Sequence, residues 1–176
     1  KRVKVFVLAI LMSLSTIPAV NAKEVTFADL ANSKDSSKID QYWLAMNMYY
    51  EAGNEPLIGK IAVGVVTLNR VRNSNFPKSV KAVVTEPNQF SWYRKVYPPQ
   101  TIDKKYYEIA YRVMHRLEYD YSYGATHFHD TSISKPKSWT RLTRVVQWSH
   151  MIFYKQEETK YAQNIRGMVG RKPQQV

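Results

Sequence analysis

The chain has 176 residues, no cysteine and a formal net charge of +12 at pH 7. Because cysteine is absent, disulfide bonds, thiol nucleophiles and thiolate metal ligands are excluded, and stability has to come from packing. An aromatic content of 13% can supply that packing, and the positive charge predicts an anionic partner.

The first 22 residues have the order of a secretory signal peptide. A basic start over residues 1–4 precedes an apolar run over residues 5–14 and small residues over 18–22. This order predicts cleavage after Ala22 and a mature protein outside the cytoplasm, in the periplasm or the cell wall. A retained membrane anchor is the alternative, although the apolar run is shorter than the ~20 residues that a spanning helix needs.

The rest of the chain has the length of one domain. We expect a polar lead-in over residues 23–38, a folded domain over 39–155 and a polar, basic tail over 156–176. Since residues 1–22 contain three basic and no acidic side chains, the mature chain would carry a net charge of +9. For an exported protein this charge favours an anionic cell envelope surface over nucleic acid, and we expect a monomer.

A buried helix is predicted over residues 39–50, which are almost all apolar or aromatic. Ser36 and Ser37 are its candidate caps, and Gly53 is expected to end it in the left-handed conformation. Glu51 then lies at the edge of the core. Burial without a cationic partner raises the pKa of a carboxyl group, so Glu51 is a candidate general acid. The alternative is a helix-end glutamate that faces water or pairs with a lysine or arginine.

A second helix is predicted from Pro56 onward, because apolar residues recur at helical spacing over residues 57–72. Glu51 and Glu55 therefore flank a junction between two helices. Gly53 and Pro56 break the helix between the two carboxylates, so their roles should differ.

The middle of the chain predicts two more helices and a loop, over residues 79–85, 102–118 and 87–92. The loop carries Gln89, Ser91 and Trp92, which together could form one wall of a ligand site. Alternatively, Phe90 and Trp92 fill the core, and both interpretations can hold at once.

Three short β-prone segments, over residues 125–129, 142–146 and 150–154, predict a small antiparallel sheet beside the helices. On a strand, His127 and His129 point to one side, whereas Thr126 and Phe128 point to the other. With His150, these imidazoles could suggest zinc. The chain lacks a His-Glu-x-x-His helix, so we interpret the histidines as groups that orient hydroxyls and carboxylates, and predict no metal and no cofactor.

Five short motifs follow one another in the chain: Tyr50-Glu51-Ala52 with Glu55-Pro56, Val65-Val66-Thr67-Leu68-Asn69-Arg70-Val71, Gln89-Phe90-Ser91-Trp92, Gly124-Ala125-Thr126-His127, and His150 with Phe153-Tyr154. In this ordered set the chain resembles the SleB/CwlJ-type cell wall hydrolases, from about Tyr42 to Lys155. It departs from the family at Gly53-Asn54, where Arg-Gly is common, and at Trp148-Ser149, where Ile-Gly is usual. Both departures concern local loop geometry.

The resemblance implies an α+β fold, mainly helical and similar to lysozymes and lytic transglycosylases, with a small antiparallel β-sheet along a glycan groove. It implies that residues 39–155 are a catalytic domain whose substrate is the glycan strands of peptidoglycan, with Glu51 as the catalytic acid. The expected substrate-binding residues are Tyr50, Glu55, Gln89, Ser91, Trp92, Thr126 and His127.

The resemblance favours a lytic transglycosylase, which cleaves between N-acetylmuramic acid (MurNAc) and N-acetylglucosamine (GlcNAc) and uses Glu51 as acid and then as base. One alternative is a lysozyme-type hydrolase with a second carboxylate, for which Glu55 is nearest in sequence. Another is a non-catalytic, basic wall-binding module. We expect a stand-alone catalytic domain, of a phage lysin or a Gram-negative remodelling enzyme.

The exported protein should begin at Lys23, since Val20 and Ala22 provide the small residues that signal peptidase requires around its cut. Amino-terminal sequencing of the protein recovered from the periplasm or medium checks this. Recovery of the full-length chain from membranes would contradict it and favour a retained anchor.

Overall fold

The computed structural model describes residue 29, residues 32–95 and residues 102–157. The expected signal peptide, half of the lead-in and the tail beyond residue 157 lie outside the described residues. The helices are α2 (Ser36–Ala52), α3 (Leu57–Arg72), α4 (Val80–Thr85), α5 (Ser91–Lys95) and α6 (Lys105–Met114), and the strands are β1 (His127–Asp130), β2 (Leu142–Trp148) and β3 (Met151–Gln156). No helix within this part of the chain is long and apolar enough to cross a membrane.

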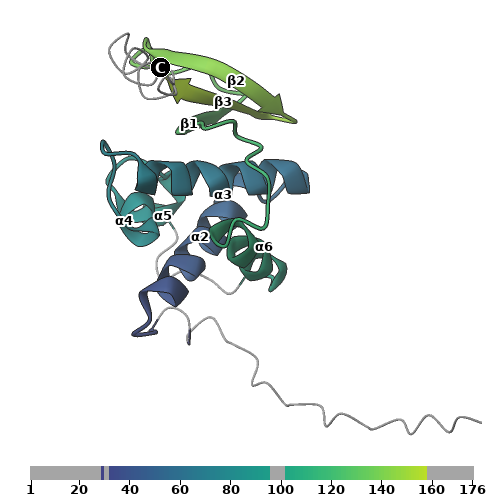
Figure 1. Ribbon diagram of the computed structural model, residues 1–176. Coiled ribbons are helices and arrows are strands. Elements are labelled where there is room, and N and C mark those ends of the chain that lie inside the picture. The colour runs from purple at the N-terminus through teal and green to yellow at the C-terminus, as the bar shows by residue number, and fades with distance from the viewer. Residues whose placement is uncertain (1–28, 30–31, 96–101, 158–176) are drawn as a thin grey trace, which may run out of the picture.

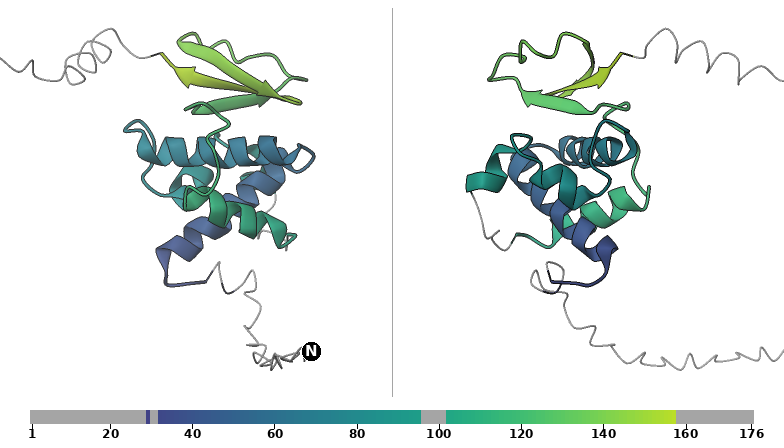
Figure 2. Two further views of the ribbon diagram at one scale, coloured as in Figure 1. Left: turned by 45° about the vertical axis from the view of Figure 1, so that its right-hand side comes forward. Right: turned by 90° about the vertical axis from the view of Figure 1, so that its left-hand side faces the viewer.

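The molecule has two layers (Figure 1). The three strands form an antiparallel sheet in the order β1-β3-β2, and this sheet lies over one side of α3. The other helices lie on the far side of α3, where α2 and α6 cross beneath it, as the turned views also show (Figure 2). The expectation of an α+β domain, mainly helical with a small antiparallel sheet, is confirmed.

Helix α3 is apolar on two faces because it lies between the two layers. Val63 and Val66 pack against Phe153 of the sheet. On its other side, Ile61 and Val65 join the larger core formed by the helices. A helix with two buried faces needs apolar residues nearly all round, which explains its composition.

Helix α2 begins and ends differently from the expectation. Its cap is Asp35, whose side chain accepts a hydrogen bond of 2.9 Å from the backbone N–H of Ser37, so the serines lie inside the helix. Gly53 keeps a right-handed φ of −55°, and the predicted left-handed turn is wrong. A Cβ atom at Gly53 would lie 2.6 Å from the carbonyl oxygen of Tyr49. Close approach of the backbone, not positive φ, therefore explains glycine at this position.

Two other boundaries also differ. Ser91 and Trp92 begin the short helix α5, whereas the sequence predicted a loop there. Helix α6 ends at Met114, four residues earlier than predicted, because Arg116 adopts a φ of 57° that a right-handed helix does not allow.

The helical core contains one fully buried amide, that of Asn47. Its Nδ2 donates to Thr67 Oγ1 over 3.1 Å, and its Oδ1 accepts from Trp92 Nε1 over 2.9 Å. These two bonds connect α2 to α3 and to α5. Because all three polar groups are buried, the Asn47 amide and the Trp92 N–H depend on these bonds for partners, whereas Thr67 Oγ1 also donates to the carbonyl oxygen of Val63 over 3.2 Å.

Replacing Asn47 by alanine should lower the free energy of unfolding by about 2–4 kcal/mol, since it leaves the buried Trp92 N–H unpaired and opens a cavity. Urea unfolding followed by circular dichroism measures the change. The control is Asn75→Ala, at an exposed position, which should stay within about 0.5 kcal/mol of the wild type. Equal stability of the two variants would contradict the structural role of Asn47.

Candidate active site

Glu51, in the last turn of α2, lies where three surface clefts meet. The first, of about 320 Å³, runs toward the sheet and is called here the sheet cleft; Arg70, Phe90, His127 and Trp139 line it with Glu51. The second, of about 380 Å³, is the junction cleft, lined by Tyr50, Gly53, Glu55, Tyr106 and Asp130 with Glu51. The third, of about 450 Å³, is the α5 cleft, lined by Gln89, Ser91, Arg94 and Lys95 with Glu51. A continuous polymer lying along these clefts would pass the Glu51 carboxyl group.

Burial controls the proton affinity of Glu51. It raises the pKa of the carboxyl group from 4.5 to about 7, while the positive charge of Arg70 acts in the opposite direction. Desolvation is the larger effect, so a substantial fraction of Glu51 is protonated at neutral pH. This is the protonation state that a general acid requires.

Arg70 is a site residue that the sequence reasoning did not single out. Its side chain is only 4% exposed. Its Nε donates to the carbonyl oxygen of Thr126 over 2.6 Å, and its Nη1 donates to Gln89 Oε1 over 3.3 Å. The guanidinium also lies 5.3 Å from the ring centre of Phe76 and 5.1 Å from that of Phe90. An arginine within the largely apolar pattern of α3 was the signal that could have found it, although the exposed Arg72 in the same turn gives the same signal.

Arg70 remains charged although it is buried. Burial lowers its pKa to about 10, and the carboxylates of Glu86 and Glu51 oppose that effect, with Glu86 the stronger of the two. The value still lies well above neutral pH. The sheet cleft therefore contains a fixed positive charge beside its acid.

His127 and Thr126, two of the expected site residues, lie side by side on the sheet. Thr126 is buried, and its Oγ1 shares a hydrogen bond of 2.9 Å with Nδ1 of His127. Burial and the charge of Arg70 lower the pKa of His127 to about 4. The imidazole is therefore neutral at pH 7 and can orient a ligand hydroxyl without adding charge.

Trp139 is a second site residue that was missed. It lies between β1 and β2, where its ring centre is 5.0 Å from that of His127 and 5.7 Å from that of Tyr154. It lines the sheet cleft. Its signal in the sequence is that it is the only aromatic residue between residues 131 and 141.

Tyr50 and Trp92, both expected to bind substrate, pack against each other. Their ring centres are 4.7 Å apart with an interplanar angle of 16°. Trp92 also stacks on Trp43, 6.3 Å away, and is only 5% exposed. Its ring is therefore covered by its neighbours, and it supports Tyr50, which lines the junction cleft. Gln89 and Ser91 are exposed and line the α5 cleft, as a ligand wall requires.

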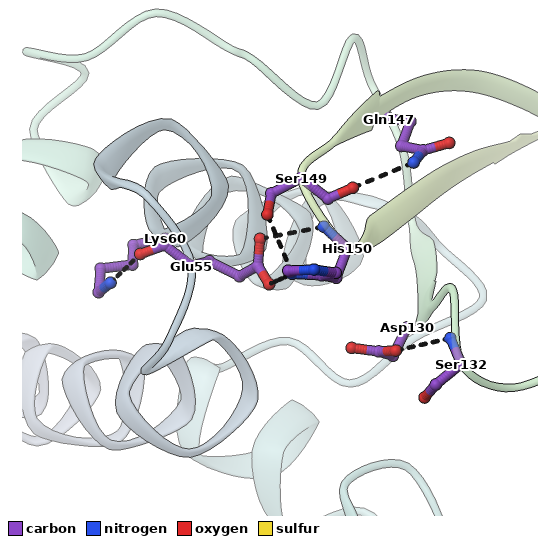
Figure 3. Close-up of polar contacts among 7 residues, drawn as sticks. All are labelled: Glu55, Lys60, Asp130, Ser132, Gln147, Ser149 and His150. Carbon is purple, nitrogen blue, oxygen red and sulfur yellow. Dashed lines mark hydrogen bonds and ion pairs between the residues drawn. The ribbon is translucent and has the colours of Figure 1, made fainter.

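Glu55 connects the helical layer to the sheet layer (Figure 3). Its Oε1 lies 3.3 Å from Nδ1 of His150, and its Oε2 accepts from the backbone N–H of His150 over 3.4 Å. The Glu55 side chain is 6% exposed, whereas that of His150 is 71% exposed. Figure 3 also shows Asp130 beside this pair, with its carboxylate accepting from the N–H of Ser132 over 2.7 Å.

The three histidines do not converge. His127 and His129 both contact Trp139, which confirms that they share one side of β1. His129 is buried, and its Nε2 lies 3.0 Å from the Tyr154 hydroxyl, whereas His150 pairs with Glu55. Across residues 32–95 and 102–157, no group of three or more His, Cys, Asp or Glu side chains is arranged to hold a metal ion.

Three comparisons with known proteins relate the chain to enzymes of the bacterial cell wall. The family described as Cell Wall Hydrolase matches residues 54–154. The crystal structure of the catalytic domain of the Bacillus cereus SleB protein superimposes with a TM-score of 0.59 and 26% identity, over 70% of this chain and 94% of that one. The catalytic domain of the germination-specific lytic transglycosylase SleB from Bacillus anthracis gives the same TM-score and identity, over 70% and 98%.

Curated relatives match over a shorter stretch. A spore cortex-lytic enzyme of Bacillus cereus is 40% identical over 55 residues, which are 31% of this chain and 21% of that protein. That of Bacillus subtilis is 44% identical over 48 residues, 27% of this chain and 16% of that protein. The matched part thus spans about a fifth of the length of the curated relatives.

The raised pKa of Glu51 predicts a pH-dependent stability. A carboxyl group whose pKa is higher in the folded state contributes stability below its unfolded pKa of 4.5, and that contribution is lost as the pH rises through about 7. Glu51→Gln should therefore match the wild type near pH 4.5 and exceed its free energy of unfolding at pH 8 by up to about 3 kcal/mol.

Urea unfolding at both pH values checks this prediction. The control is Glu108→Gln, on the exposed face of α6. A Glu51→Gln variant with no gain in stability between pH 4.5 and pH 8 would show that the carboxyl group is not desolvated.

Proposed function

The chain belongs to the cell wall hydrolase family, and on that basis we propose that it cleaves peptidoglycan between MurNAc and GlcNAc as a lytic transglycosylase. One observation supports this proposal most strongly. Glu51, the acid whose pKa is raised to about 7, borders all three clefts. The protein would act outside the cytoplasm, as a monomer held by its positive charge near the anionic cell envelope.

The first step is proton donation. Protonated Glu51 gives its proton to the oxygen that bridges C1 of MurNAc and C4 of GlcNAc. The C1–O bond breaks, the GlcNAc C4 hydroxyl leaves, and positive charge develops on C1 and the ring oxygen of MurNAc. Glu51 becomes a carboxylate, which the nearby charge of Arg70 stabilises.

The second step is ring closure. The Glu51 carboxylate accepts the proton of the MurNAc C6 hydroxyl while O6 bonds to C1, which gives a 1,6-anhydro product and restores the protonated acid. No water molecule is consumed. The neutral His127 and the exposed Gln89 and Ser91 would hold the sugar hydroxyls, and Trp139 would cover the intermediate from the sheet side.

A two-carboxylate hydrolase is the second candidate, because Glu55 and Asp130 line the junction cleft together with Glu51. Hydrogen bonds from the side chain and backbone of Ser132 lower the pKa of Asp130, so it is ionised at neutral pH. An ionised partner could activate water or attack C1. Glu55 already pairs with His150, which makes Asp130 the stronger rival.

Glu51→Gln should reduce the rate of wall lysis by about 10²–10⁴-fold, because the amide matches the acid in shape but cannot donate the proton. The loss of turbidity of purified peptidoglycan measures lysis, and circular dichroism verifies the fold. Glu108→Gln is the matched control and should retain full activity. Near-normal lysis by folded Glu51→Gln would show that Glu51 is not the general acid. Failure of the wild type to clear peptidoglycan would favour a wall-binding module.

The products should carry 1,6-anhydro-MurNAc ends, and both Glu55→Gln and Asp130→Asn should retain this chemistry. Mass spectrometry of the released fragments distinguishes anhydro ends from reducing ends, which are 18 Da heavier by one water. Reducing MurNAc ends would contradict the transglycosylase. Loss of activity in folded Asp130→Asn as complete as in Glu51→Gln would identify Asp130 as the second carboxylate.

A further inference from the structure

The groove around Glu51 differs in charge between its two ends. Arg94 and Lys95, both exposed on α5, line the α5 cleft, and Glu51 is the only acidic residue among the described residues that line it. Burial keeps much of Glu51 protonated at neutral pH, so this cleft carries a net positive charge.

The junction cleft has the opposite sign. Glu55 and Asp130 line it with Glu51, and no lysine or arginine is among its described lining residues. Two lysines lie nearby. The Lys60 ammonium donates to the backbone carbonyl of Glu55 (Figure 3), and Lys105 Nζ lies 5.5 Å from the ring centre of Tyr106 and pairs with Asp103 over 2.9 Å. A ligand carboxylate would therefore be repelled in the junction cleft and attracted in the α5 cleft.

The charge of each cleft indicates which part of the proposed substrate it can bind, because only some parts of peptidoglycan are charged. The N-acetylated sugars of the glycan strand are uncharged, whereas the stem peptide on each MurNAc ends in free carboxylates. We infer that Arg94 and Lys95 bind the stem-peptide carboxylates of the MurNAc unit at the cleavage site, so that the α5 cleft determines the orientation of the strand. This inference rests on the proposed function.

The other lining groups suit a peptide as well. Gln89 and Ser91 are exposed in the same cleft and offer an amide and a hydroxyl for hydrogen bonds to a peptide backbone. Both basic side chains line the same cleft, so both can reach one carboxyl-bearing chain. With the stem in the α5 cleft, the scissile bond lies at Glu51 and the next sugar extends toward the junction cleft.

The test combines a double variant with a chemically modified substrate. Soluble peptidoglycan fragments are prepared in two forms, native and with their carboxylates converted to amides by a carbodiimide and ammonia. Wild type and Arg94→Gln/Lys95→Gln are compared on both by kcat and KM. The control is Lys34→Gln/Lys38→Gln, which removes two exposed charges at the other end of α2, about 20 Å from Glu51.

Amidation should raise the KM of the wild type by about tenfold, and the Arg94→Gln/Lys95→Gln variant should show a similar increase on native fragments. The same variant should be insensitive to amidation, because the two changes remove the same contacts. The control variant should keep the sensitivity of the wild type.

A variant as sensitive to amidation as the wild type, or an equal loss in the control, would overturn the assignment and leave only general attraction between a basic protein and an acidic polymer. If wild type releases no fragments from either substrate, it is the proposed function that fails. If both substrates are cleaved but the effects of amidation and of the Arg94→Gln/Lys95→Gln variant are independent, only the inference about the α5 cleft fails.

Discussion

The buried guanidinium of Arg70 is the interaction on which the site depends. It binds the carbonyl oxygen of Thr126, so α3 and the start of the sheet are held in one arrangement. It also binds Gln89 and lies against Phe90, which secures the segment before α5. A charge removed from water in this way is stable only with such partners, and loss of one of them weakens its compensation. One side chain thus joins the walls of the sheet cleft.

The same charge determines the electrostatics of the chemistry. Desolvation raises the pKa of Glu51, and Arg70 limits the increase, so that the value comes to about 7. Desolvation and Arg70 act together on His127, whose pKa falls to about 4. Two titratable groups in one cleft are therefore both neutral for much of the time near pH 7, one as a proton donor and the other as an uncharged hydrogen-bonding group. This combination suits a reaction in which a single carboxyl group serves as acid and base.

The groove exists because two layers meet at α3. The helical layer contributes Glu51, and the sheet layer contributes His127 and Trp139. The bond between Glu55 and His150 links the same layers at the other end of the groove. The α3 residues that hold the layers together are apolar and closely packed. Packing in the core therefore fixes the position of Glu51 relative to His127 and Trp139.

The sequence by itself determined the features that depend on neighbours along the chain. Periodicity indicated the helices and the short strands, and the apolar run before Glu51 indicated a carboxyl group at the edge of a core, because burial of a helix follows from its own pattern. Only the tertiary structure decided the contacts between distant segments. It placed Arg70 beside Glu51, packed Trp92 against Tyr50 and Trp43, and brought Glu55 to a histidine 95 residues away. Such contacts arise from packing two layers together, which no local pattern encodes.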